Sequence, residues 1–325
     1  MDYAGVLSAI ESYPSVALIS HIMPDGDTMG SALALAMHLN AAGKEVALFC
    51  EHPVPPACRF LAMSETFRQP GSWDAQNETY PLVIAVDCSD LERLGTARPI
   101  YDSAECTVNI DHHISNKRYA RINLVDERAA AVGEMIFSLI RSAGGTVDKP
   151  MAEALYAAIS TDTGNFSYSN TTPATHHTAA ELLACGIDVY TLNNILFRTH
   201  SLGRTRLLAR VLGTLEMHRE GTVALLTATD DMMRQSGAKE SETEGMINFA
   251  REIDTVQVGI LFRSRTDGTV KVSFRSKEYV DVSALAQSFG GGGHTRAAGC
   301  TIEGSLEAVK KQVLDRLLPM MERKH

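Results

Sequence analysis

The chain has 325 residues, which is more than a single compact core usually holds, and this length predicts two domains. Hydrophobic residues make up 45% of the chain and charged residues 21%, which are ordinary values for a globular protein and exclude global disorder. The formal net charge of −9 argues against a protein that wraps long duplex nucleic acid through an extended basic surface. It does not exclude a short anionic substrate held by a few local cations.

The sequence also bears on the protein's location. No apolar run approaches the roughly 18 to 20 residues that span a bilayer, and the start Met1-Asp2-Tyr3 lacks the basic residues and apolar core of a signal peptide. We therefore expect a cytoplasmic protein with no membrane partner. A homodimer is compatible with the sequence.

Strand and helix patterns alternate through the first half of the chain, as in an α/β domain. Apolar runs predict strands at residues 16–19, 45–49, 82–86 and 106–110, and amphipathic patterns predict helices at residues 7–13, 31–40, 132–142, 151–160 and 173–184. Short, continuously apolar strands are typical of a parallel sheet that is buried on both faces. The first domain, residues 1–190, is therefore predicted to be a parallel sheet with flanking helices.

The pattern changes after residue 190. Residues 191–215 stay helical but carry several arginines, and we interpret them as a helical linker. Strands are then predicted at residues 222–227, 256–263 and 269–274, with a hairpin turn at Thr266-Asp267-Gly268. A short helix at residues 282–289, a glycine run and a closing helix at residues 306–321 follow. Residues 216–325 are therefore predicted to form a smaller α/β domain with a mixed sheet.

Potential metal ligands stand where four of the predicted elements end. His21, Asp25 and Asp27 follow the first strand, Asp87 follows the third, Asp111-His112-His113 closes the fourth, and Asp162 follows the helix at residues 151–160. In an open α/β sheet, ligands bind in the crevice at the carboxyl ends of the strands. These side chains are therefore expected to converge on one site, and their number predicts a double metal site.

Several of these segments also have a plain structural explanation. Asp25-Gly26-Asp27 is typical of a turn, in which Gly26 would allow a tight bend. Asp87 could merely begin a turn or cap the next helix. Two consecutive histidines at a buried strand end are harder to explain without a ligand, since each imidazole needs hydrogen-bond partners there. Asp162 is unfavourable beside the negative end of a helix unless a cation compensates it.

The ligand chemistry narrows the choice of metal. Tetrahedral zinc sites prefer cysteine and histidine, whereas carboxylates with some imidazole suit Mn²⁺ or Mg²⁺, and the histidines favour Mn²⁺. Four aspartates would formally neutralise two divalent ions. We therefore expect two Mn²⁺ ions per chain, with Mg²⁺ or Co²⁺ as substitutes. Two ions that clamp the attacking and leaving oxygens and acidify a bridging water are typical of phosphate ester hydrolysis.

A glycine run in the second half supplies a candidate phosphate site. Gly290 to Gly293 precede His294 and Arg296. The run could be a flexible linker. It lies inside the predicted domain, however, where glycine N–H groups can approach an anion closely and both side chains add donors. Arg275 ends a predicted strand, where it either lies on a solvated edge or grips phosphate with its guanidinium, and the sequence does not decide which face it takes.

The assembled motifs resemble the DHH phosphoesterase family, whose name is the triplet found here at Asp111-His112-His113. The glycine run, His294 and the following Arg296-Ala297-Ala298-Gly299 resemble the associated DHHA1 substrate-binding domain. The motifs occur in the family's order and cover the chain from Ser15 to about Gly304.

This resemblance implies a role for each candidate residue. One metal ion would be held by His21, Asp25 and Asp87, and the other by Asp27, Asp87, His112 and Asp162, with Asp87 as the bridge. The catalytic residues would be Asp87, His113 beside the reacting phosphate, and Asp111, which would orient the histidines. Substrate phosphate would be held across a cleft by the second domain, through Arg275, Gly291, Gly292, Gly293, His294 and Arg296.

The compact two-domain form is similar to the nanoRNase and pAp phosphatase branch of the family. This similarity implies a manganese-dependent enzyme that trims short oligoribonucleotides to mononucleotides and converts 3′-phosphoadenosine 5′-phosphate (pAp) to AMP by attack of a metal-bridging hydroxide. Three alternatives are a phosphodiesterase for pApA or cyclic dinucleotides, an exopolyphosphatase-like hydrolase, and a nucleotide sensor without catalysis. The last is disfavoured because no ligand position is substituted. Ser273-Phe274-Arg275-Ser276-Lys277 does not match the Ser-Arg-Lys signature of family II pyrophosphatases, which resemble this chain in the first domain.

Overall fold

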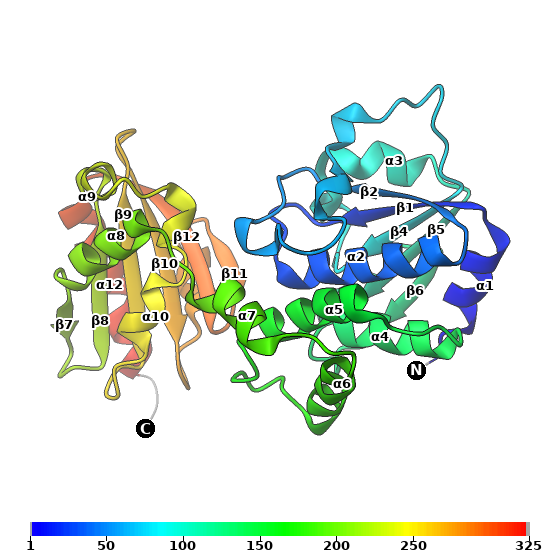
Figure 1. The fold of residues 1–325 in the computed structure, drawn as a ribbon. Coiled ribbons are helices and arrows are strands. Elements are labelled where there is room, and N and C mark those ends of the chain that lie inside the picture. The colour runs from blue at the N-terminus through cyan, green and yellow to red at the C-terminus, as the bar shows by residue number, and fades with distance from the viewer. Residues whose placement is uncertain (1, 323–325) are drawn as a thin grey trace. The chain divides into compact units, whose positions relative to one another are not determined.

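The computed structural model describes residues 2–322. The chain divides into two compact units, Met1–Thr199 and His200–His325 (Figure 1). Each unit contains a sheet of six strands with helices packed on it. Among the described residues, no helix has both the length and the apolar character that crossing a membrane requires.

The sheet of the first unit is parallel throughout, with the strand order β3-β2-β1-β4-β5-β6. The strands are β1 (Ser15–Ser20), β2 (Glu45–Phe49), β3 (Phe67–Arg68), β4 (Leu82–Val86), β5 (Cys106–Asp111) and β6 (Ile122–Val125). β1 and β4 are buried along their whole length, because successive residues face cores on opposite sides of the sheet. Leu18, for example, belongs to one hydrophobic cluster and Ile19 to another. Burial on both faces explains why these strands are continuously apolar.

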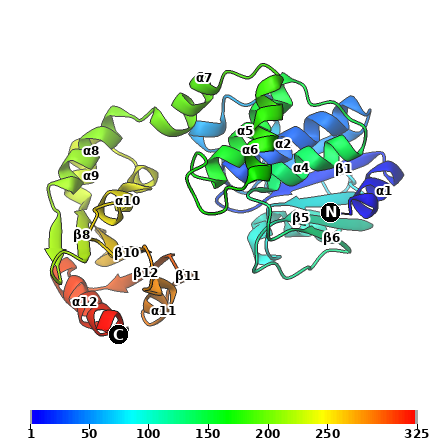
Figure 2. The same ribbon diagram turned by 90° about the horizontal axis from the view of Figure 1, so that it is seen from below.

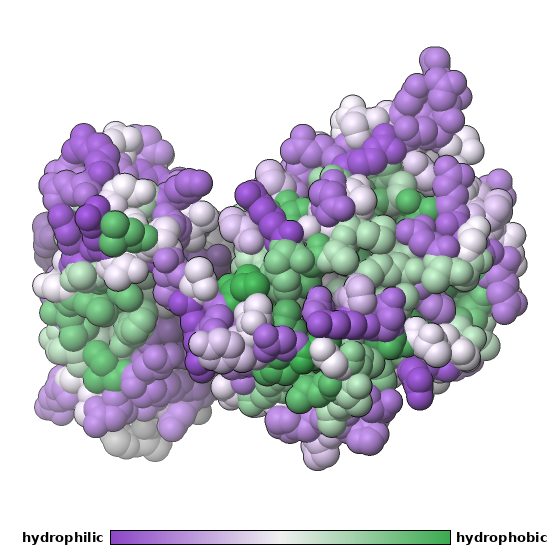
Figure 3. All heavy atoms as spheres, viewed as in Figure 1, coloured by the Kyte–Doolittle hydropathy of each residue, from purple (hydrophilic) through white to green (hydrophobic). Residues whose placement is uncertain are grey.

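Helices cover both faces of this sheet. On one face, α2 (Gly26–Ala41), α4 (Val132–Ser142) and α5 (Lys149–Asp162) pack together, as Figure 2 shows. On the other face lie the shorter α3 (Arg98–Asp102) and the segments around it. The remaining helices of this unit are α1 (Ala4–Ser12), α6 (Pro173–Ala184) and α7 (Val189–Asn193), with a π-helical turn at Asn194–Arg198 and 3₁₀ turns at Pro56–Cys58, Ser64–Thr66, Pro70–Ser72 and Glu92–Ala97. Hydrophilic side chains dominate the projecting loop between β3 and β4 (Figure 3).

The sheet of the second unit is mixed, with the order β11-β12-β10-β9-β8-β7. Its strands are β7 (Glu216–His218), β8 (Val223–Ala228), β9 (Val258–Ser264), β10 (Thr269–Ser276), β11 (Gly292–His294) and β12 (Ala297–Glu303). β8 and β9 are parallel, and the other pairs are antiparallel. The helices are α8 (Leu202–Leu212), α9 (Asp230–Ser236), α10 (Met246–Arg251), α11 (Val282–Gln287) and α12 (Leu306–Glu322), with a 3₁₀ turn at Glu240–Thr243.

Two clusters of buried side chains hold this second sheet between its helices. α11 and α12 contribute Leu285 and Val313 to a core with Phe274 of β10. On the opposite face, α8 contributes Leu207 to a core with Leu261 of β9, which α10 also covers. Alternation along each strand therefore sends successive side chains into different layers.

The predicted α/β class, with one parallel and one mixed sheet, is confirmed. The strands at 45–49 and 82–86 and the helices at 132–142 and 173–184 have the predicted bounds. The elements that the sequence did not predict are β3, β6, β7, β11, β12, α3, α9 and α10. Most of these are short, so that neighbouring elements rather than their own pattern stabilise them. α2 begins at Gly26 instead of residue 31, because Asp25 already caps it.

The segment predicted as a helical linker is not one continuous helix. α7 and the π-helical turn end the first unit, and Thr199 is extended. α8 then starts a new helix in the second unit, where the Ser201 hydroxyl caps it by accepting from the N–H of Arg204 over 2.9 Å. The boundary between the units lies at residues 199 and 200, within the predicted linker range 191–215.

Candidate metal centre

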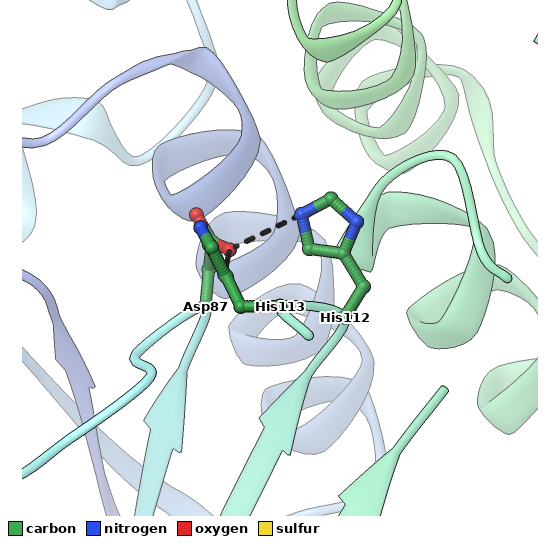
Figure 4. A group of neighbouring side chains, drawn as sticks. All are labelled: Asp87, His112 and His113. Atoms are coloured by element: carbon green, nitrogen blue, oxygen red, sulfur yellow. Dashed lines mark ion pairs between the residues drawn. The ribbon is translucent and has the colours of Figure 1, made fainter. Parts of the chain in front are cut away.

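The six predicted metal ligands come together at the carboxyl end of the parallel sheet. Their side-chain atoms form overlapping groups that could each hold a metal ion. The groups are His21 with Asp25 and Asp87, Asp27 with His112 and Asp162, and Asp87 with His112 and His113. Figure 4 shows the last group, in which both histidines follow β5 and approach Asp87 at the end of β4.

His21 presents one ring nitrogen to two carboxylates. Its Nδ1 lies 2.7 Å from the backbone oxygen of Ile22, and because a carbonyl oxygen only accepts, Nδ1–H is the donor. Nε2 then lies 3.3 Å from Asp87 Oδ2 and 3.7 Å from Asp25 Oδ2, with no hydrogen-bond partner. Burial alone would lower the pKa of His21, but the two carboxylates outweigh it and raise the pKa to about 9. A cation, whether a proton or a metal ion, is therefore favoured between these side chains.

His112 is oriented in the same way. Its Nδ1–H donates to the backbone oxygen of Ala129 over 3.1 Å, which leaves Nε2 free to face the cluster. Nε2 lies 3.5 Å from Asp162 Oδ2, 3.7 Å from Asp87 Oδ1 and 3.9 Å from Asp27 Oδ2. These separations exceed hydrogen-bond length. The ring thus faces three carboxylates without pairing with any one of them.

Asp87 is shared by two of the groups. It is buried and has a φ of 58°, a conformation in which a residue with a Cβ is strained. Its N–H donates to Ile110 of β5 over 2.9 Å, which fixes this conformation. Its Oδ1 has no hydrogen-bond partner. Strain that holds a buried, unpartnered carboxylate oxygen favours a functional position over a simple turn.

Asp25 begins α2 and also faces His21. Its Oδ1 accepts from the N–H groups of Asp27 and Thr28, as in a helix N-cap. The other oxygen, Oδ2, is the one near His21. One carboxylate thus positions the first turn of α2 and contributes to the cluster.

Asp27 caps a second helix that is far away in sequence. Its Oδ2 accepts from the N–H of Val132 over 2.7 Å and its Oδ1 from the N–H of Gly133 over 3.0 Å, at the start of α4. Ser31 adds a third hydrogen bond over 3.0 Å. The N-cap residue of α4, Ala131, has no side chain able to do this. Asp27 therefore joins α2 to α4 at the cluster.

Gly26 does not act as the flexible turn residue that its neighbours suggested. It is the first residue of α2, and its φ is not positive. A Cβ at this position would overlap the side chain of Thr161 in α5. The absence of a side chain brings α2 and α5 close together, and with them Asp27 and Asp162.

The carboxylates carry more negative charge than the nearby histidines compensate. Burial raises the pKa of Asp27 well above its usual range, and the charges of Asp87 and Asp162 add to this effect. Burial also raises the pKa of Asp162 to about 6, although the neighbouring His112 acts against it. Ionised carboxylates at this site are therefore disfavoured unless a cation accompanies them. Together with the orphaned Nε2 of His21 and Oδ1 of Asp87, this shows that the donor set fits divalent metal ions.

Asp111 uses its carboxylate within its own segment. Its Oδ1 accepts from the N–H of His112 over 2.8 Å and from both the N–H and the Nδ1–H of His113 over 3.3 and 2.8 Å. Its Oδ2 accepts from the side-chain amide of Asn116. Burial would raise the pKa of Asp111, but the hydrogen bond from His113 and the other donors outweigh it and lower the pKa. None of the ligand groups among the described residues includes Asp111.

His113 is left with one free ring nitrogen. The hydrogen bond from Nδ1 to Asp111 raises the pKa of His113, although burial acts against it. The side chain is 25% exposed, so the ring is accessible as well as oriented. With Nδ1 engaged, Nε2 is the atom of His113 that can contact a bound molecule.

In the second unit, Arg275 and His294 lie on the same face of the sheet. Ala297 of β12 pairs with His294 of β11 on one side and with Arg275 of β10 on the other. Directly paired residues point to the same side of a sheet. Phe274, the neighbour of Arg275, points to the opposite side, where it is buried. Of the alternatives that the sequence left open, Arg275 thus takes the face of His294, where its Nη1–H donates to the backbone oxygen of Phe274.

The surface between these two side chains is made of small residues. The row beside Ala297 consists of Gly292, Gly299 and Ser273, which pair with one another across the strands. A bound anion could approach the sheet here without steric hindrance from large side chains. Arg296 is exposed in the turn before β12, and its Nη1–H donates to the backbone oxygen of Val280 over 2.9 Å.

The glycine run is structured, which excludes the alternative that it is a flexible linker. Gly292 lies in β11, and its Cβ would meet open space. A Cβ on Gly291 would overlap Gly299, and one on Gly293 would lie against Ala297 and Ala298. Gly293 also has a φ of 139°, which side chains with a Cβ rarely adopt. Packing therefore explains Gly291 and Gly293, whereas packing does not require a glycine at Gly292.

Two family models match the chain in succession. The DHH family, N-terminal domain, matches residues 15–159, and the DHHA1 domain matches residues 220–323. In addition, the bifunctional oligoribonuclease and PAP phosphatase NrnA of Thermus thermophilus is 34% identical over 96% of this chain and 91% of its own length. The chain belongs to the DHH family. The expectation from the triplet and the glycine run is confirmed.

Other relatives of this DHH protein match it over nearly their full length. The protein of the same name from Bacillus subtilis is 29% identical over 98% of this chain and 96% of its own. Among solved structures, an exopolyphosphatase-related protein from Bacteroides fragilis has a TM-score of 0.91 and 26% identity, and covers 98% of this chain and 97% of its own. The two-unit architecture is thus shared by chains of this size.

Three residues of the DHH domain that the sequence did not predict affect the site without belonging to the ligand groups, through a hydrogen-bond network that includes Asp111 or through charge. Asn116 donates to Asp111 and also to Asn109 over 2.8 Å, and the buried Asn109 donates to backbone oxygens of Ala85 and Cys88. The positive charge of Arg93 acts on His113 and opposes the rise in its pKa. A buried asparagine between the apolar Val108 and Ile110 of strand β5 is the one signal that the sequence offered for this network.

Proposed function

We propose that this protein is a metal-dependent phosphoesterase that hydrolyses short oligoribonucleotides to mononucleotides and converts pAp to AMP. The observation that carries the proposal is the convergence of two imidazole Nε2 atoms and four carboxylates at the end of the DHH sheet. The names of the two NrnA relatives support the substrates. The net charge of −9 supports short substrates over long duplexes.

The proposed metal ions are two Mn²⁺ per chain, which suit carboxylates mixed with imidazole. His21, Asp25 and Asp87 would hold one ion. Asp27, Asp87, His112 and Asp162 would hold the other, with Asp87 as the shared ligand. When bound, the ions would supply Lewis acidity, which lowers the pKa of water and offsets charge on phosphate oxygens.

Within the chain, His113 and Asp111 would handle the proton. The proposed role of His113 is to contact the reacting phosphate and to donate the Nε2 proton to the leaving oxygen. The buried Asp111 carboxylate would keep Nδ1 protonated and would stabilise the positive charge of the ring. This role is supported by the 2.8 Å hydrogen bond between them and by the raised pKa of His113.

The DHHA1 domain would bind the remaining phosphate of the substrate. Arg275 and His294 flank a surface of small residues, which suits a phosphate group between two side chains with N–H donors. The proposed contacts are the side chains of Arg275, His294 and Arg296 and the backbone of Gly291, Gly292 and Gly293.

One alternative activity is favoured by a specific observation. The solved structure with a TM-score of 0.91 is described as exopolyphosphatase-related. Polyphosphate hydrolysis would use the same metal cluster and would require neither a base nor a ribose. A phosphodiesterase for pApA or cyclic dinucleotides would likewise share every metal ligand, so substrate competition must separate these activities.

The purified protein should be assayed side by side on pAp, a diribonucleotide, pApA, polyphosphate and a long single-stranded RNA. We expect the highest kcat/KM for pAp and the diribonucleotide, activity lost to a chelator, and activity restored best by Mn²⁺ over Mg²⁺ and Co²⁺. Fastest hydrolysis of the long strand or of polyphosphate would contradict the proposal. Full activity after metal removal would contradict the metal assignment.

A further inference from the structure

The loop after α5 has an unusual backbone directly beside the cluster. Gly164, Asn165 and Phe166 have successive φ values of 56°, 57° and 62°, which makes a left-handed turn. Residues with a Cβ rarely adopt this conformation, and here two do so in succession. The N–H of Asn165 holds the turn by donating to Ser160 over 2.6 Å. Backbone strain of this kind persists where the surrounding structure imposes it, often at functional sites.

The left-handed turn partly buries one aromatic ring and exposes another. Phe166 packs between Tyr156 at 5.8 Å and His176 at 5.4 Å. Tyr168, two residues later, is 51% exposed. Its ring lies so close to Gly164 that a Cβ there would overlap it. Since Gly164 is only two residues from Asp162, the exposed ring of Tyr168 is held beside the segment that carries this candidate ligand.

Two further exposed apolar side chains are attached to ligand-bearing segments. Ile114 directly follows His113 and is 80% exposed. Met23 lies two residues after His21, is 72% exposed and has a strained φ of 55°. Among the described residues of the first unit, the other large hydrophobic side chains with such exposure are Leu183 and Tyr190, which are remote from these segments in sequence. Exposed apolar groups are thus concentrated on the segments that form the cluster.

We propose that Tyr168, together with Ile114 and Met23, forms an apolar contact surface for the nucleobase of the nucleotide whose phosphate lies at the cluster. This inference rests on the proposed function and adds a base contact within the DHH domain itself. A nucleobase has an apolar face that an exposed aromatic ring can stack on, whatever the identity of the base. Contact would also remove exposed apolar surface from water. Polyphosphate would gain nothing from this surface, because it has no base.

The test compares a nucleotide with the same molecule lacking its base. The full-length, Mn²⁺-loaded protein is assayed on pAp and on ribose 3,5-bisphosphate, with Tyr168→Leu, Tyr168→Phe and Ile114→Ser. Tyr190→Leu is the matched control, since Tyr190 is 74% exposed on α7. We expect Tyr168→Leu to raise the KM for pAp by on the order of tenfold. Tyr168→Phe should retain the wild-type KM, Ile114→Ser should raise it to a smaller extent, and the KM for ribose 3,5-bisphosphate should not change.

The outcomes separate this inference from the proposed function. If Tyr168→Leu affects both substrates equally, or neither, the base contact is wrong. If Tyr168→Leu does not fold, the Ile114→Ser variant at its highly exposed position decides by the same comparison. If the wild-type protein hydrolyses neither pAp nor dinucleotides, the proposed function fails. Calorimetric titration with AMP and ribose 5-phosphate then decides the base contact alone: a wild-type preference for AMP that Tyr168→Leu abolishes supports it, and no such preference overturns it.

Discussion

The Nδ1–H of His113 donates to Oδ1 of Asp111 over 2.8 Å, and the same oxygen accepts from the backbone N–H of His113. One buried carboxylate therefore fixes both the position of the chain and the orientation of the ring. This arrangement gives the three residues of the triplet Asp111-His112-His113 different partners. His112 turns its Nε2 towards the aspartates of the cluster, while His113 keeps its own Nε2 free.

Asp111→Asn should lower kcat by on the order of 10² to 10³, because an amide accepts fewer hydrogen bonds and no longer compensates a positive charge on His113. Metal content should not change, since Asp111 belongs to none of the ligand groups among the described residues. The measurements are steady-state kinetics and metal analysis of the purified variant. His113→Gln is the control and should lose a similar factor. Loss of bound metal in Asp111→Asn would show that Asp111 acts through the cluster instead.

Asp87→Asn should release both metal ions and abolish activity, because Asp87 is the residue common to both proposed ion sites. The metal-free variant should nevertheless unfold at a higher temperature than the metal-free wild type. The reason is that a neutral amide replaces a buried carboxylate whose Oδ1 has no hydrogen-bond partner. Asparagine also tolerates the φ of 58° at this position. Metal analysis and calorimetry provide both measurements.

Asp87→Ala provides the matched comparison. It should lose the metal ions as well, but alanine is strained at this φ, so its metal-free melting temperature should lie below that of Asp87→Asn. Two metal ions retained by either variant would refute the assignment of Asp87 as the bridge.

The stability of the metal-free protein should fall as the pH rises. The pKa of His21 is raised from 6.5 to about 9, so the folded chain binds this proton more tightly than the unfolded chain. The stabilisation is complete below pH 6.5 and is lost as the pH rises through 9, a loss on the order of 1–3 kcal/mol. The pKa of Asp162 is raised from 3.8 to about 6, so its protonation also stabilises the folded protein. This stabilisation is lost as the pH rises from 3.8 to about 6. Thermal unfolding across this pH range measures the effect.

Saturating Mn²⁺ should reverse this dependence, because a metal ion and a proton compete for Nε2 of His21. The melting temperature of the metal-loaded protein should therefore rise with pH over the range in which that of the metal-free protein falls. His21→Gln serves as the control, and should flatten the fall between pH 6.5 and 9. A fall of undiminished size in this variant would assign the effect to other groups.

Two neighbouring glycines should respond differently to alanine. Gly293→Ala should lower the free energy of unfolding by about 1–3 kcal/mol, because its Cβ would lie against Ala297 and Ala298 and its φ is 139°. Gly292→Ala should change stability by less than about 0.5 kcal/mol, since its Cβ meets open space. It should instead raise the KM for pAp if phosphate approaches this surface. Denaturant unfolding and kinetics on both variants measure this contrast, and an unchanged KM in Gly292→Ala would exclude close approach.

Arg275→Ala should raise the KM for pAp at least about tenfold with a smaller effect on kcat, because the variant loses a proposed bidentate guanidinium contact to a phosphate that does not react. Lys271→Ala is the control, since Lys271 is an exposed cation of β10 that points to the same face as Arg275. An equal rise in KM for both variants would indicate general electrostatic attraction. A selective loss of kcat in Arg275→Ala would place this residue in the chemistry.

The strands could be predicted largely from the sequence because burial on both faces leaves a simple signature. β1 and β4 are buried along their whole length and contain continuous apolar runs, and their ends mark where the next residue meets the edge of the sheet. This is why Asp87 could be expected beside His112 although the two are separated in the chain. Short elements such as β3 and α10 escaped prediction because their stability comes from neighbours rather than from their own pattern.

The sequence by itself determined which residue types meet at the site, since strand ends in a parallel sheet must share one edge. Only the tertiary structure decided what each residue does there. Three of these roles depend on contacts between distant segments. Asp27 caps α4, Gly26 leaves space for the side chain of Thr161, and Arg275 shares a face of the sheet with His294. The left-handed turn that exposes Tyr168 is likewise held by hydrogen bonds and packing that no local pattern encodes. Periodicity is a property of neighbouring residues, whereas orientation, charge compensation and strain arise only when the folded chain brings separate segments together.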